Sequence, residues 1–438
     1  MAIDEELGSL IAQSTELISN SQPEDAVTLL KQQFSKYETN PLYLQSLGES
    51  LLESGDMENA YDTLQQGCKL DPLALQGVEK FLYLGQIIGG SDGIQLLSVG
   101  VARLSKQLKQ ADANFNGIEL PGSIVEAVQS FASANNKSTE QDEENDETLQ
   151  LLAKAYPTLE TIRVYLLKRI NETIFAMIEI WMTDLCMEPR AESECESLIQ
   201  LSLQLDPTNG ETWSLLASIR ISQQRFKDAQ DAVCKSWEFL SSKKSKLEDA
   251  SAGQLNNNGT TTGDAEIDEE TITEIQADYV DLDQPLTTLA KYSIELGQFE
   301  LAITISSSIQ DINENSIESY YLEGFANYLN AIRIQEGLSL DNLEGCLELA
   351  RDFENHHLKK SSATTEDDES VGYVNDARVA LSNGYKLLQV DEVAEQTDDG
   401  VKSAIESLLN QVGGFLLKEK DVSGLDESNW ETEIAMDD

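Results

Sequence analysis

The sequence predicts an all-α fold, a right-handed superhelix (α-solenoid) of stacked helical hairpins with acidic disordered insertions and an acidic tail. Two observations lead to this prediction. Ala26 and Ala60 lie 34 residues apart and each follows an acidic helix start, which is the spacing of a helical-hairpin repeat. The chain also has 438 residues, which is too long for one ordinary core but suits an array that grows in one dimension.

The first complete hairpin is predicted from one helix over residues 42–54 and a second over residues 57–69. Gly48 is small where the two helices cross, and Gly55 permits the tight turn between them. Pro72 stops the second helix because proline has no backbone N–H. The whole pattern resembles a tetratricopeptide repeat.

The same template recurs along the chain and predicts about six units, several of them divergent. Two later copies fit it well, at residues 213–229 and 286–302. Residues 81–97 are a degenerate copy because Leu97 stands where a small residue is usual, and residues 176–207 are degenerate too. The apolar stripes of all these units are interpreted as core, since each hairpin must bury a face against its neighbours.

Polar and acidic segments interrupt the repeats and divide the chain. The predicted order is N-terminal repeats over residues 1–132, an acidic disordered insertion over 133–147, central repeats over 148–249, an Asn/Thr-rich and then acidic insertion over 250–283, C-terminal repeats and a capping helix over 284–418 with a loop at 361–370, and an acidic tail over 419–438. The lysines at positions 243, 244 and 246 are interpreted as the cationic C-terminal end of a helix.

The charge balance restricts the class of partner. The chain has 79 Asp and Glu against 30 Lys and Arg, a formal net charge of -49. This argues against direct binding of nucleic acid or of an anionic membrane, and for a cationic partner. The N-terminal residues have no export signal, so the five cysteines are expected to be reduced thiols of an intracellular protein.

No motif for catalysis, a cofactor or a metal is found, and the chain is predicted not to be an enzyme. His356 and His357 are the two histidines, and they are expected to be solvated loop residues. The sequence contains no HExxH, CxxC or phosphate-binding glycine loop. Gly89 and Gly90 are interpreted as a turn that ends a helix.

A groove along the first helices of the hairpins is the predicted binding site. The candidate residues are Gln45, Glu49, Leu52, Glu53, Glu79, Asp184, Glu188, Glu211, Glu318, Tyr321, Phe325 and Tyr328. Carboxylates beside exposed aromatic rings suit a Lys/Arg-rich, partly extended peptide. Repeats that bind acidic chaperone C-termini carry Lys and Asn at the fifth and ninth positions. Here Gln45, Glu49, Ser214 and Ser218 occupy them, which argues against such a site.

The sequence also resembles a known family over nearly its whole length, through PEDAVTLLKQQF, NPLYLQSLGESLLESGDMENAY and above all EKFLYLGQIIGGSDGIQLL. It is similar to the fungal dedicated assembly chaperones of large-subunit ribosomal protein four. The resemblance implies that the groove captures this newly made basic protein, including its internal loop, and keeps it soluble. It further implies presence in cytoplasm and nucleus, contact with a nuclear import factor, and release onto the pre-60S ribosome.

Two other classes stay open on the residues alone. An acidic repeat scaffold would use the same hairpins to join partners of neutral or mixed charge. A histone-type chaperone would bind another basic nuclear client, and competition between histones and the ribosomal protein would distinguish the two clients.

Overall fold

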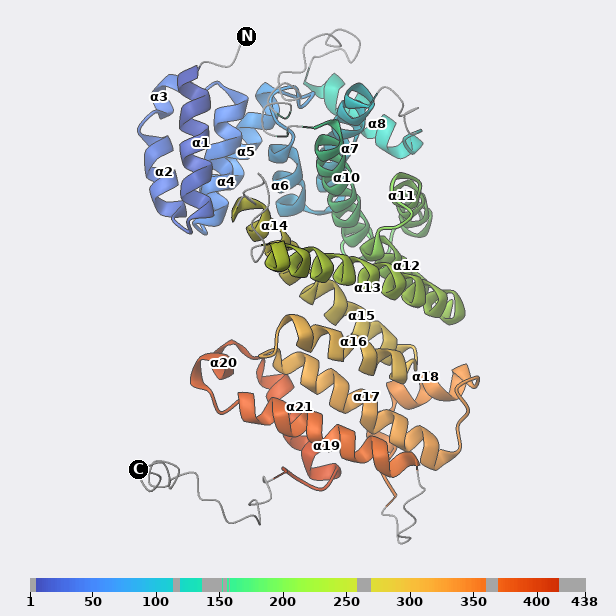
Figure 1. Ribbon diagram of the computed structural model, residues 1–438. Coiled ribbons are helices and arrows are strands. Elements are labelled where there is room, and N and C mark those ends of the chain that lie inside the picture. Colours follow the sequence, from blue (N-terminus) through green and yellow to red (C-terminus); the bar gives the residue numbers. More distant parts are fainter. Residues whose placement is uncertain are drawn as a thin grey trace, which may run out of the picture. The chain divides into compact units, whose positions relative to one another are not determined.

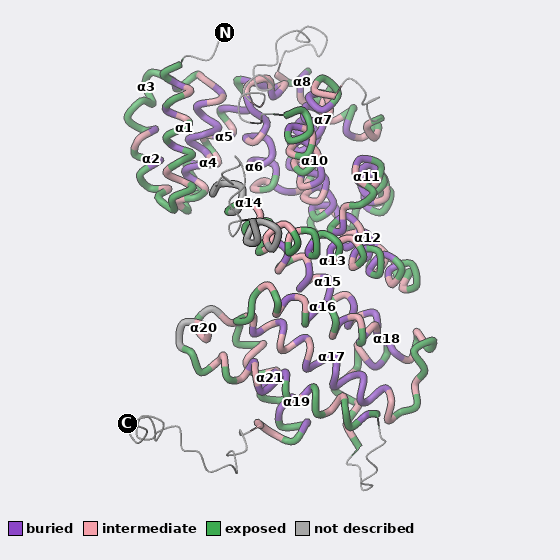
Figure 2. Tube along the Cα trace, in the orientation of Figure 1, coloured by how far each residue is buried: buried purple, intermediate pink, exposed green. Residues whose placement is uncertain are grey.

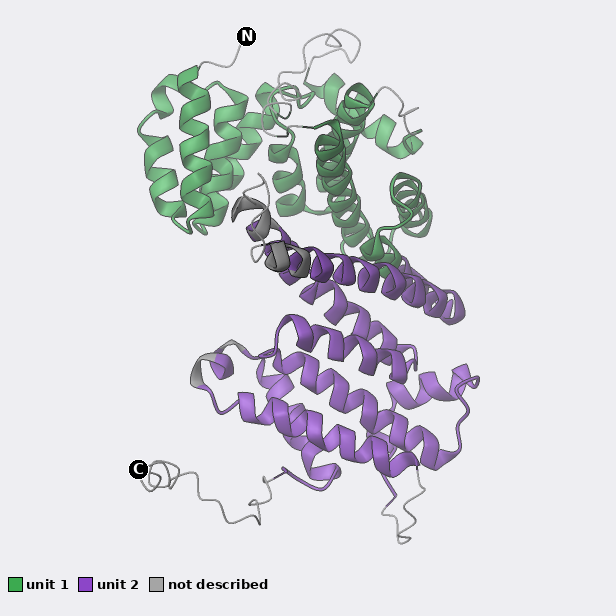
Figure 3. Cartoon of the chain, in the orientation of Figure 1, with its two compact units in different colours: residues 1–215 green, residues 216–438 purple. Residues whose placement is uncertain are grey.

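The computed structural model describes residues 5–112, 119–135, 158–257, 269–359 and 369–416, together with Leu152 and Tyr156. The chain divides into two compact units, residues 1–215 and residues 216–438 (Figure 3). Every regular element in the described ranges is a helix, so the all-α prediction is confirmed (Figure 1). No helix in these ranges combines the length and the apolar character needed to cross a bilayer.

The first unit is built from consecutive helical hairpins. Its helices are α1 (Glu5–Ser19), α2 (Pro23–Lys31), α3 (Phe34–Tyr37), α4 (Pro41–Glu53), α5 (Met57–Leu70), α6 (Glu79–Ile88), α7 (Gly90–Ala111), α8 (Gly122–Ala134), α10 (Leu159–Met182) and α11 (Ala191–Leu205). The helices pair as α1 with α2, α4 with α5, α6 with α7, and α10 with α11, while α7 also packs against α8 and α10. This pairing is the stacked-hairpin arrangement that the repeats predict.

Local signals explain where α4 and α5 begin and end. The Asn40 side chain caps α4 by accepting hydrogen bonds from the backbone N–H groups of Leu42 and Tyr43. Gly55 has a φ of 80° in the turn, a conformation that glycine adopts without strain. A Cβ atom at Gly48 would lie 2.5 Å from the Leu64 side chain, so the two helices cross closely there. The predicted hairpin is confirmed, with bounds shifted by one residue.

The next hairpin explains why Leu97 is tolerated at a crossing position. Gly85 of α6 faces it, and a Cβ atom at Gly85 would lie 2.7 Å from the Leu97 Cγ atom. Gly85 thus makes room for Leu97 in the way that Gly48 of α4 makes room for Leu64 of α5. Gly89 and Gly90 have φ angles of 62° and 53° between α6 and α7, which confirms the predicted turn.

A buried ion pair fixes the junction between α5 and α6. The Lys80 side chain is fully buried, and its Nζ atom lies 2.9 Å from the Oδ2 atom of Asp71, whose side chain is 5 % exposed. The ammonium group also donates to the backbone carbonyls of Gln76 and Gly77, so all three of its donors have partners. The Asp71 carboxylate in turn accepts from two backbone N–H groups of the loop.

The second unit contains longer and less regular hairpins. Its helices are α13 (Phe226–Asn257), α14 (Glu269–Val280), α15 (Asp283–Glu295), α16 (Phe299–Ile312), α17 (Ile317–Glu336), α18 (Leu343–Arg351), a 3₁₀ turn η1 (Phe353–Asn355), α19 (Glu369–Leu387), α20 (Asp391–Gln396) and α21 (Asp399–Gln411). Helix α12 (Gly210–Ser222) spans the boundary between the units. Helix α17 packs between α16 and α19 and is buried along much of its length (Figure 2).

Two predictions for this unit are wrong. The Asn/Thr-rich part of the insertion, residues 250–264, is expected to be disordered, yet α13 continues to Asn257, and the acidic part that follows contains α14. Lys244 is expected at a helix end, yet it lies within α13, where its Nζ atom bonds Glu248 at 2.8 Å and Asp311 at 3.0 Å. Residues 136–147, 258–264, 361–368 and 419–438 lie outside the described residues. The predicted capping helix corresponds to α21, which packs on α17 and α19.

Candidate functional site

The first helices of three consecutive hairpins bring acidic and tyrosine side chains together in the first unit. Glu79 at the start of α6 lies at the centre of this group. It accepts hydrogen bonds from Gln45 Nε2 of α4 and from Tyr165 Oη of α10, each at 3.2 Å. The guanidinium Nε atom of Arg169 on α10 lies 3.8 Å from the same carboxylate. The site therefore joins side chains that are distant in sequence.

A second carboxylate extends the group along α4. Tyr83 on α6 donates a hydrogen bond of 3.3 Å to Glu49, and Arg169 Nη1 lies 2.7 Å from Glu172. We call these side chains the Glu79 network: Gln45, Glu49, Glu79, Tyr83, Tyr165, Arg169 and Glu172. It contains three carboxylates and one guanidinium, so its net charge is negative when all three acids are ionised.

Burial strengthens the electrostatic interactions in the Glu79 network. Burial, and then the negative charge of Glu79, raises the pKa of the Glu49 carboxyl. The pKa of Tyr83 is raised by burial and by Glu49, and that of Tyr165 by burial and by Glu79. Burial acts to lower the pKa of Arg169, but the charges of Glu79 and Glu172 outweigh it, and the pKa is raised. The tyrosines thus stay neutral donors.

Three of the predicted residues on α4 differ in exposure. Glu53 is exposed beside the Glu79 network, and its charge acts on Glu49. Gln45 is buried and bonded to Glu79, so its amide positions that carboxylate instead of facing a ligand. Leu52 is half-buried and packs against the N-terminal core cluster, and its place in the groove stays a prediction.

The predicted acids of the later hairpins of this unit lie elsewhere. Asp184 and Glu188 are exposed but follow the C-terminal end of α10, so their placement on a first helix is wrong. Asp184 Oδ2 accepts a hydrogen bond of 2.9 Å from the backbone N–H of Gly90 at the start of α7. Glu211 is exposed in the first turn of α12. The structure does not bring these three acids into the Glu79 network.

In the second unit the predicted aromatic residues are mostly buried. Tyr328 is 1 % exposed and donates a hydrogen bond to Gln411, and Phe325 is 8 % exposed. The expectation of exposed rings at these two positions is therefore wrong, because α19 and α21 cover α17. Tyr321 is half-buried and stacks on Phe325, and Glu318 pairs with Lys291 at 2.7 Å.

Sequence reasoning missed Tyr83, Tyr165 and Arg169. Tyr83 could have been found, since Glu49 and Tyr83 are separated by 34 residues, as are Gln45 and Glu79. Residues one repeat period apart lie side by side on neighbouring first helices. The long first helix α10 follows a segment that does not keep the period, so no such signal was available for Tyr165 and Arg169.

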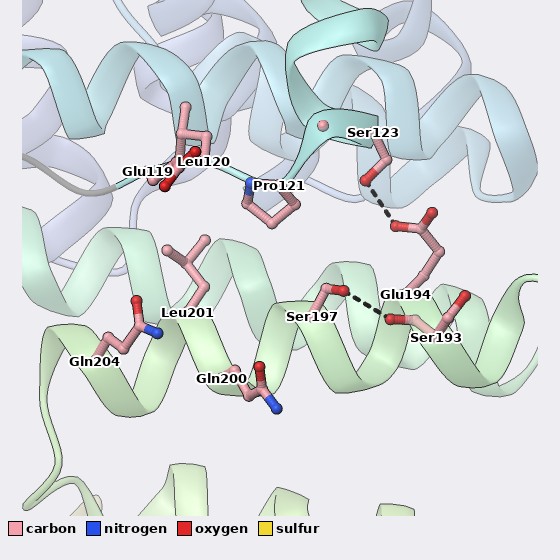
Figure 4. Close-up of a pocket in the computed structure, with 11 residues that line it drawn as sticks. Glu119, Leu120, Pro121, Ser123, Ser193, Glu194, Ser197, Gln200, Leu201 and Gln204 are labelled. Carbon is pink, nitrogen blue, oxygen red and sulfur yellow. Dashed lines mark hydrogen bonds between the residues drawn. The ribbon is translucent and has the colours of Figure 1, made fainter.

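A separate cavity of about 520 Å³ lies between residues 119–123 and α11 (Figure 4). Ser123 donates a hydrogen bond of 2.7 Å to Glu194 across it. The other side chains on its α11 side are mostly serine and glutamine, and the carboxylates of Glu119 and Glu194 are its charged groups. It is lined by a second helix of a hairpin and lies apart from the Glu79 network.

The described residues offer no group of three or more His, Cys, Asp or Glu side chains placed to hold a metal ion. The Nδ1 atom of His356 lies 2.8 Å from the Oε1 atom of Glu336, and the residue is half-buried. It is therefore not the fully solvated loop residue that is expected from the sequence. All five cysteines are free thiols. Burial raises the pKa of Cys68 to about 12 and that of Cys195 to about 11, so neither is a reactive nucleophile.

The stacked hairpins define a class, the helical-repeat proteins. Comparison with known proteins is more specific. Residues 315–427 match the model of the ACL4 C-terminal domain family. The resemblance seen in the sequence is thereby confirmed for the part of the chain that the family model covers.

Two curated fungal proteins are similar to this chain, and both are named "Probable assembly chaperone of rpl4". The one from Schizosaccharomyces pombe is 26% identical over 271 residues, which span 60% of this chain and 62% of the relative. The one from Emericella nidulans is 27% identical over 249 residues, which span 54% of this chain and 50% of the relative. The matches thus span less than two thirds of either relative's own length.

A solved structure entitled "Assembly Chaperone of RpL4 (Acl4) (Residues 1-338)" is also similar. It is 21% identical with a TM-score of 0.49, and the match covers 75% of this chain and 98% of the solved one.

Proposed function

We propose that this chain is a dedicated chaperone that binds newly made, highly basic ribosomal protein four of the large subunit. The observation that carries the proposal is the Glu79 network, in which Glu49 and Glu79 from neighbouring first helices lie together with Glu53 exposed beside them. The net charge of -49 and the printed names of the two curated relatives support it.

The mechanism we propose is reversible neutralisation of a basic segment, including the client's internal loop. A Lys/Arg-rich segment destined for ribosomal RNA binds any polyanion before assembly. An acidic protein surface holds it with an affinity that falls as salt rises. Ribosomal RNA has a higher charge density and displaces the chaperone at the pre-60S ribosome. In this role the protein is a binding protein and not an enzyme, as the names of its relatives also imply.

We further propose that the protein acts in both cytoplasm and nucleus. A client that is made in the cytoplasm and assembled in the nucleus requires its chaperone, or an import factor bound to both, to pass between the two. Imaging of the fluorescently tagged chain tests this part. Exclusion of the tagged protein from the nucleus, also when nuclear export is blocked, would contradict it.

The binding proposal is tested by capture of the purified ribosomal protein. We expect Glu49→Gln combined with Glu53→Lys to weaken capture about three- to tenfold, because it changes the charge of the acidic face by three units. The matched control is Glu58→Gln combined with Asp62→Lys, which makes the same charge change at exposed positions of α5. Equal weakening by both pairs, or by neither, would sink the proposal that the first helices bind the client.

A further inference from the structure

A second pocket lies within the second unit, between α17, the η1 turn and α21. Its volume is about 480 Å³, and its lining includes Tyr321, Phe325, Phe353 and Leu408. Phe325 and Leu408 are buried and form its apolar base, while Tyr321 and Phe353 are half-buried. A volume of this size accommodates one long side chain with its adjoining backbone. We call it the aromatic pocket.

The three rings of the aromatic pocket are fixed by one another. Tyr321 and Phe325 are parallel, with centroids 5.8 Å apart and an interplanar angle of 5°. Phe353 meets Phe325 edge to face, with centroids 4.9 Å apart and an angle of 74°. Such contacts stabilise the ring positions, so the pocket presents aromatic surface that is already ordered.

The polar side chains around these rings mostly carry hydrogen-bond acceptors. Glu354 contributes a carboxylate, and Ser403 and Ser407 contribute two hydroxyls, while the Oε1 atom of Gln411 already accepts a hydrogen bond from Tyr328. Burial, and then the negative charge of Glu318, raises the pKa of the Tyr321 phenol. Glu318 is therefore a second carboxylate whose charge acts on these rings. The described residues that line the pocket include His357 but neither Lys nor Arg. The pocket therefore suits a ligand that carries positive charge and several donors.

We infer that the aromatic pocket binds the arginine side chain of a basic polypeptide. A guanidinium group is planar, stacks on aromatic faces and has five N–H donors, so it matches both the rings and the acceptors. Glu354 pairs with its charge. Lysine has a compact, strongly hydrated ammonium group and fits the rings less well. An acidic segment would meet Glu354 as a like charge.

This inference extends the proposed function to a second site, since an arginine of the proposed client would meet the pocket. It does not require that client, because any exposed arginine can be bound. The lining residues run from 321 to 411, within the part of the chain that matches the family model. They share no residue with the Glu79 network, so the two sites can be tested separately.

The experiment uses the full chain and short blocked peptides, Gly-Arg-Gly and its citrulline, lysine and leucine analogues, in saturation-transfer NMR. Citrulline has the shape of arginine without its charge. We expect the citrulline peptide to bind about tenfold more weakly than the arginine peptide. Glu354→Gln and Phe353→Leu should each weaken arginine binding about fivefold. Glu348→Gln, an exposed position on α18 outside the pocket, should leave it unchanged.

Several results would overturn the inference. One is equal binding of the arginine and citrulline peptides, and another is tighter binding of the leucine peptide, which would make the pocket an apolar one. Unchanged arginine binding in Glu354→Gln and Phe353→Leu would place the binding elsewhere. Arginine-peptide binding that appears only after deletion of residues 417–438 would overturn the assignment of the pocket to a basic polypeptide, since it would mean that the chain's own acidic tail occupies it. Loss of ribosomal-protein capture with intact arginine-peptide binding would count against the proposed function alone.

Discussion

The two units use the same helical hairpin but place different chemistry on its first helix. In the first unit α4, α6 and α10 carry the carboxylates and tyrosines of the Glu79 network. In the second unit α17 carries the stacked rings of Tyr321 and Phe325. Small residues fix the crossing in both, at Gly48 against Leu64 and at Gly324 against Leu381. The comparison teaches that small residues at the crossings determine the hairpin, while other first-helix positions are free to carry different side chains.

The units also differ in how they hold a lysine. Lys80 of the first unit is fully buried with Asp71, whereas Lys244 of the second pairs with Glu248 and Asp311, whose side chains are 43% and 64% exposed. Removing a partner from a buried pair leaves an unpaired charge in a low dielectric. Lys244 is itself only 10% exposed but has two acidic partners that face solvent, so after removal of one the other acid and water still pair with it. The next four predictions test these contrasts in order of decreasing effect.

We expect the largest effect from Asp71→Asn. The variant replaces one carboxylate oxygen with an amide N–H₂ group, which must face either the Leu75 N–H group or the Gln76 N–H group together with the Lys80 ammonium. The free energy of unfolding of the first unit should fall by about 3–5 kcal/mol, as measured by denaturant-dependent hydrogen exchange. The matched control, Asp311→Asn beside Lys244, should cost at most about 1 kcal/mol. Equal costs at the two sites would contradict the contrast.

Gly93→Ala should have the next largest effect. A Cβ atom at Gly93 would overlap the backbone carbonyl oxygen of Gly85, so α6 and α7 must move apart. We expect a loss of about 1–3 kcal/mol in unfolding free energy, although alanine favours helices. Gly372→Ala on α19 is the control, because its Cβ would meet no atom within 4 Å, and it should stabilise by about 0.5–1 kcal/mol. Stabilisation by both changes would show that the α6–α7 crossing is loose.

Glu49→Gln should change the pH dependence of stability. Burial and the charge of Glu79 raise the pKa of Glu49, so the native chain binds this proton more tightly than the unfolded chain does. Stability therefore falls as the pH rises from the ordinary carboxyl pKa through the raised one. Glutamine removes this loss and still accepts the Tyr83 hydrogen bond. Thermal unfolding from pH 4 to pH 8 should show a flatter profile and a higher midpoint at neutral pH; a lower midpoint there would contradict the burial of this charge.

The smallest effect is expected from Glu318→Gln. Its partner Lys291 is 49% exposed and Glu318 itself 41%, so solvent screens the pair. The unfolding free energy should change by about 0–1 kcal/mol, as measured by urea unfolding. A larger loss of unfolding free energy would show that the ion pair at the start of α17 stabilises the fold as strongly as the buried ion pair of the first unit.

The fold could be predicted from the sequence where local signals and repeat spacing agree. Gly48, Gly55 and Pro72 placed α4 and α5 to within about one residue because each acts on the backbone directly. Composition gave the wrong prediction for α14, because its acidic residues favour an irregular insertion and yet form a helix. It also misled for Tyr328, because only long-range packing against α21 shows that the ring is buried.

The candidate site could be predicted only in part. The repeat period brings Gln45 beside Glu79, and Glu49 beside Tyr83, so the acids of α4 and α6 could be found in advance. Arg169 could not, since its approach to Glu79 depends on the packing of α10 against α7. The compensation of negative charge by a guanidinium inside the acidic face is therefore a property of the folded chain alone.

The central claim is that the first helices of the first unit bind a basic client. Hydrogen–deuterium exchange of the full chain, with and without large-subunit ribosomal protein four, tests it most directly. We expect the client to slow exchange in α4, α6 and α10 more than in α5, α7 and α11, and this difference should diminish as salt is raised. Slowing confined to the second helices, or slowing that salt leaves unchanged, would contradict the account.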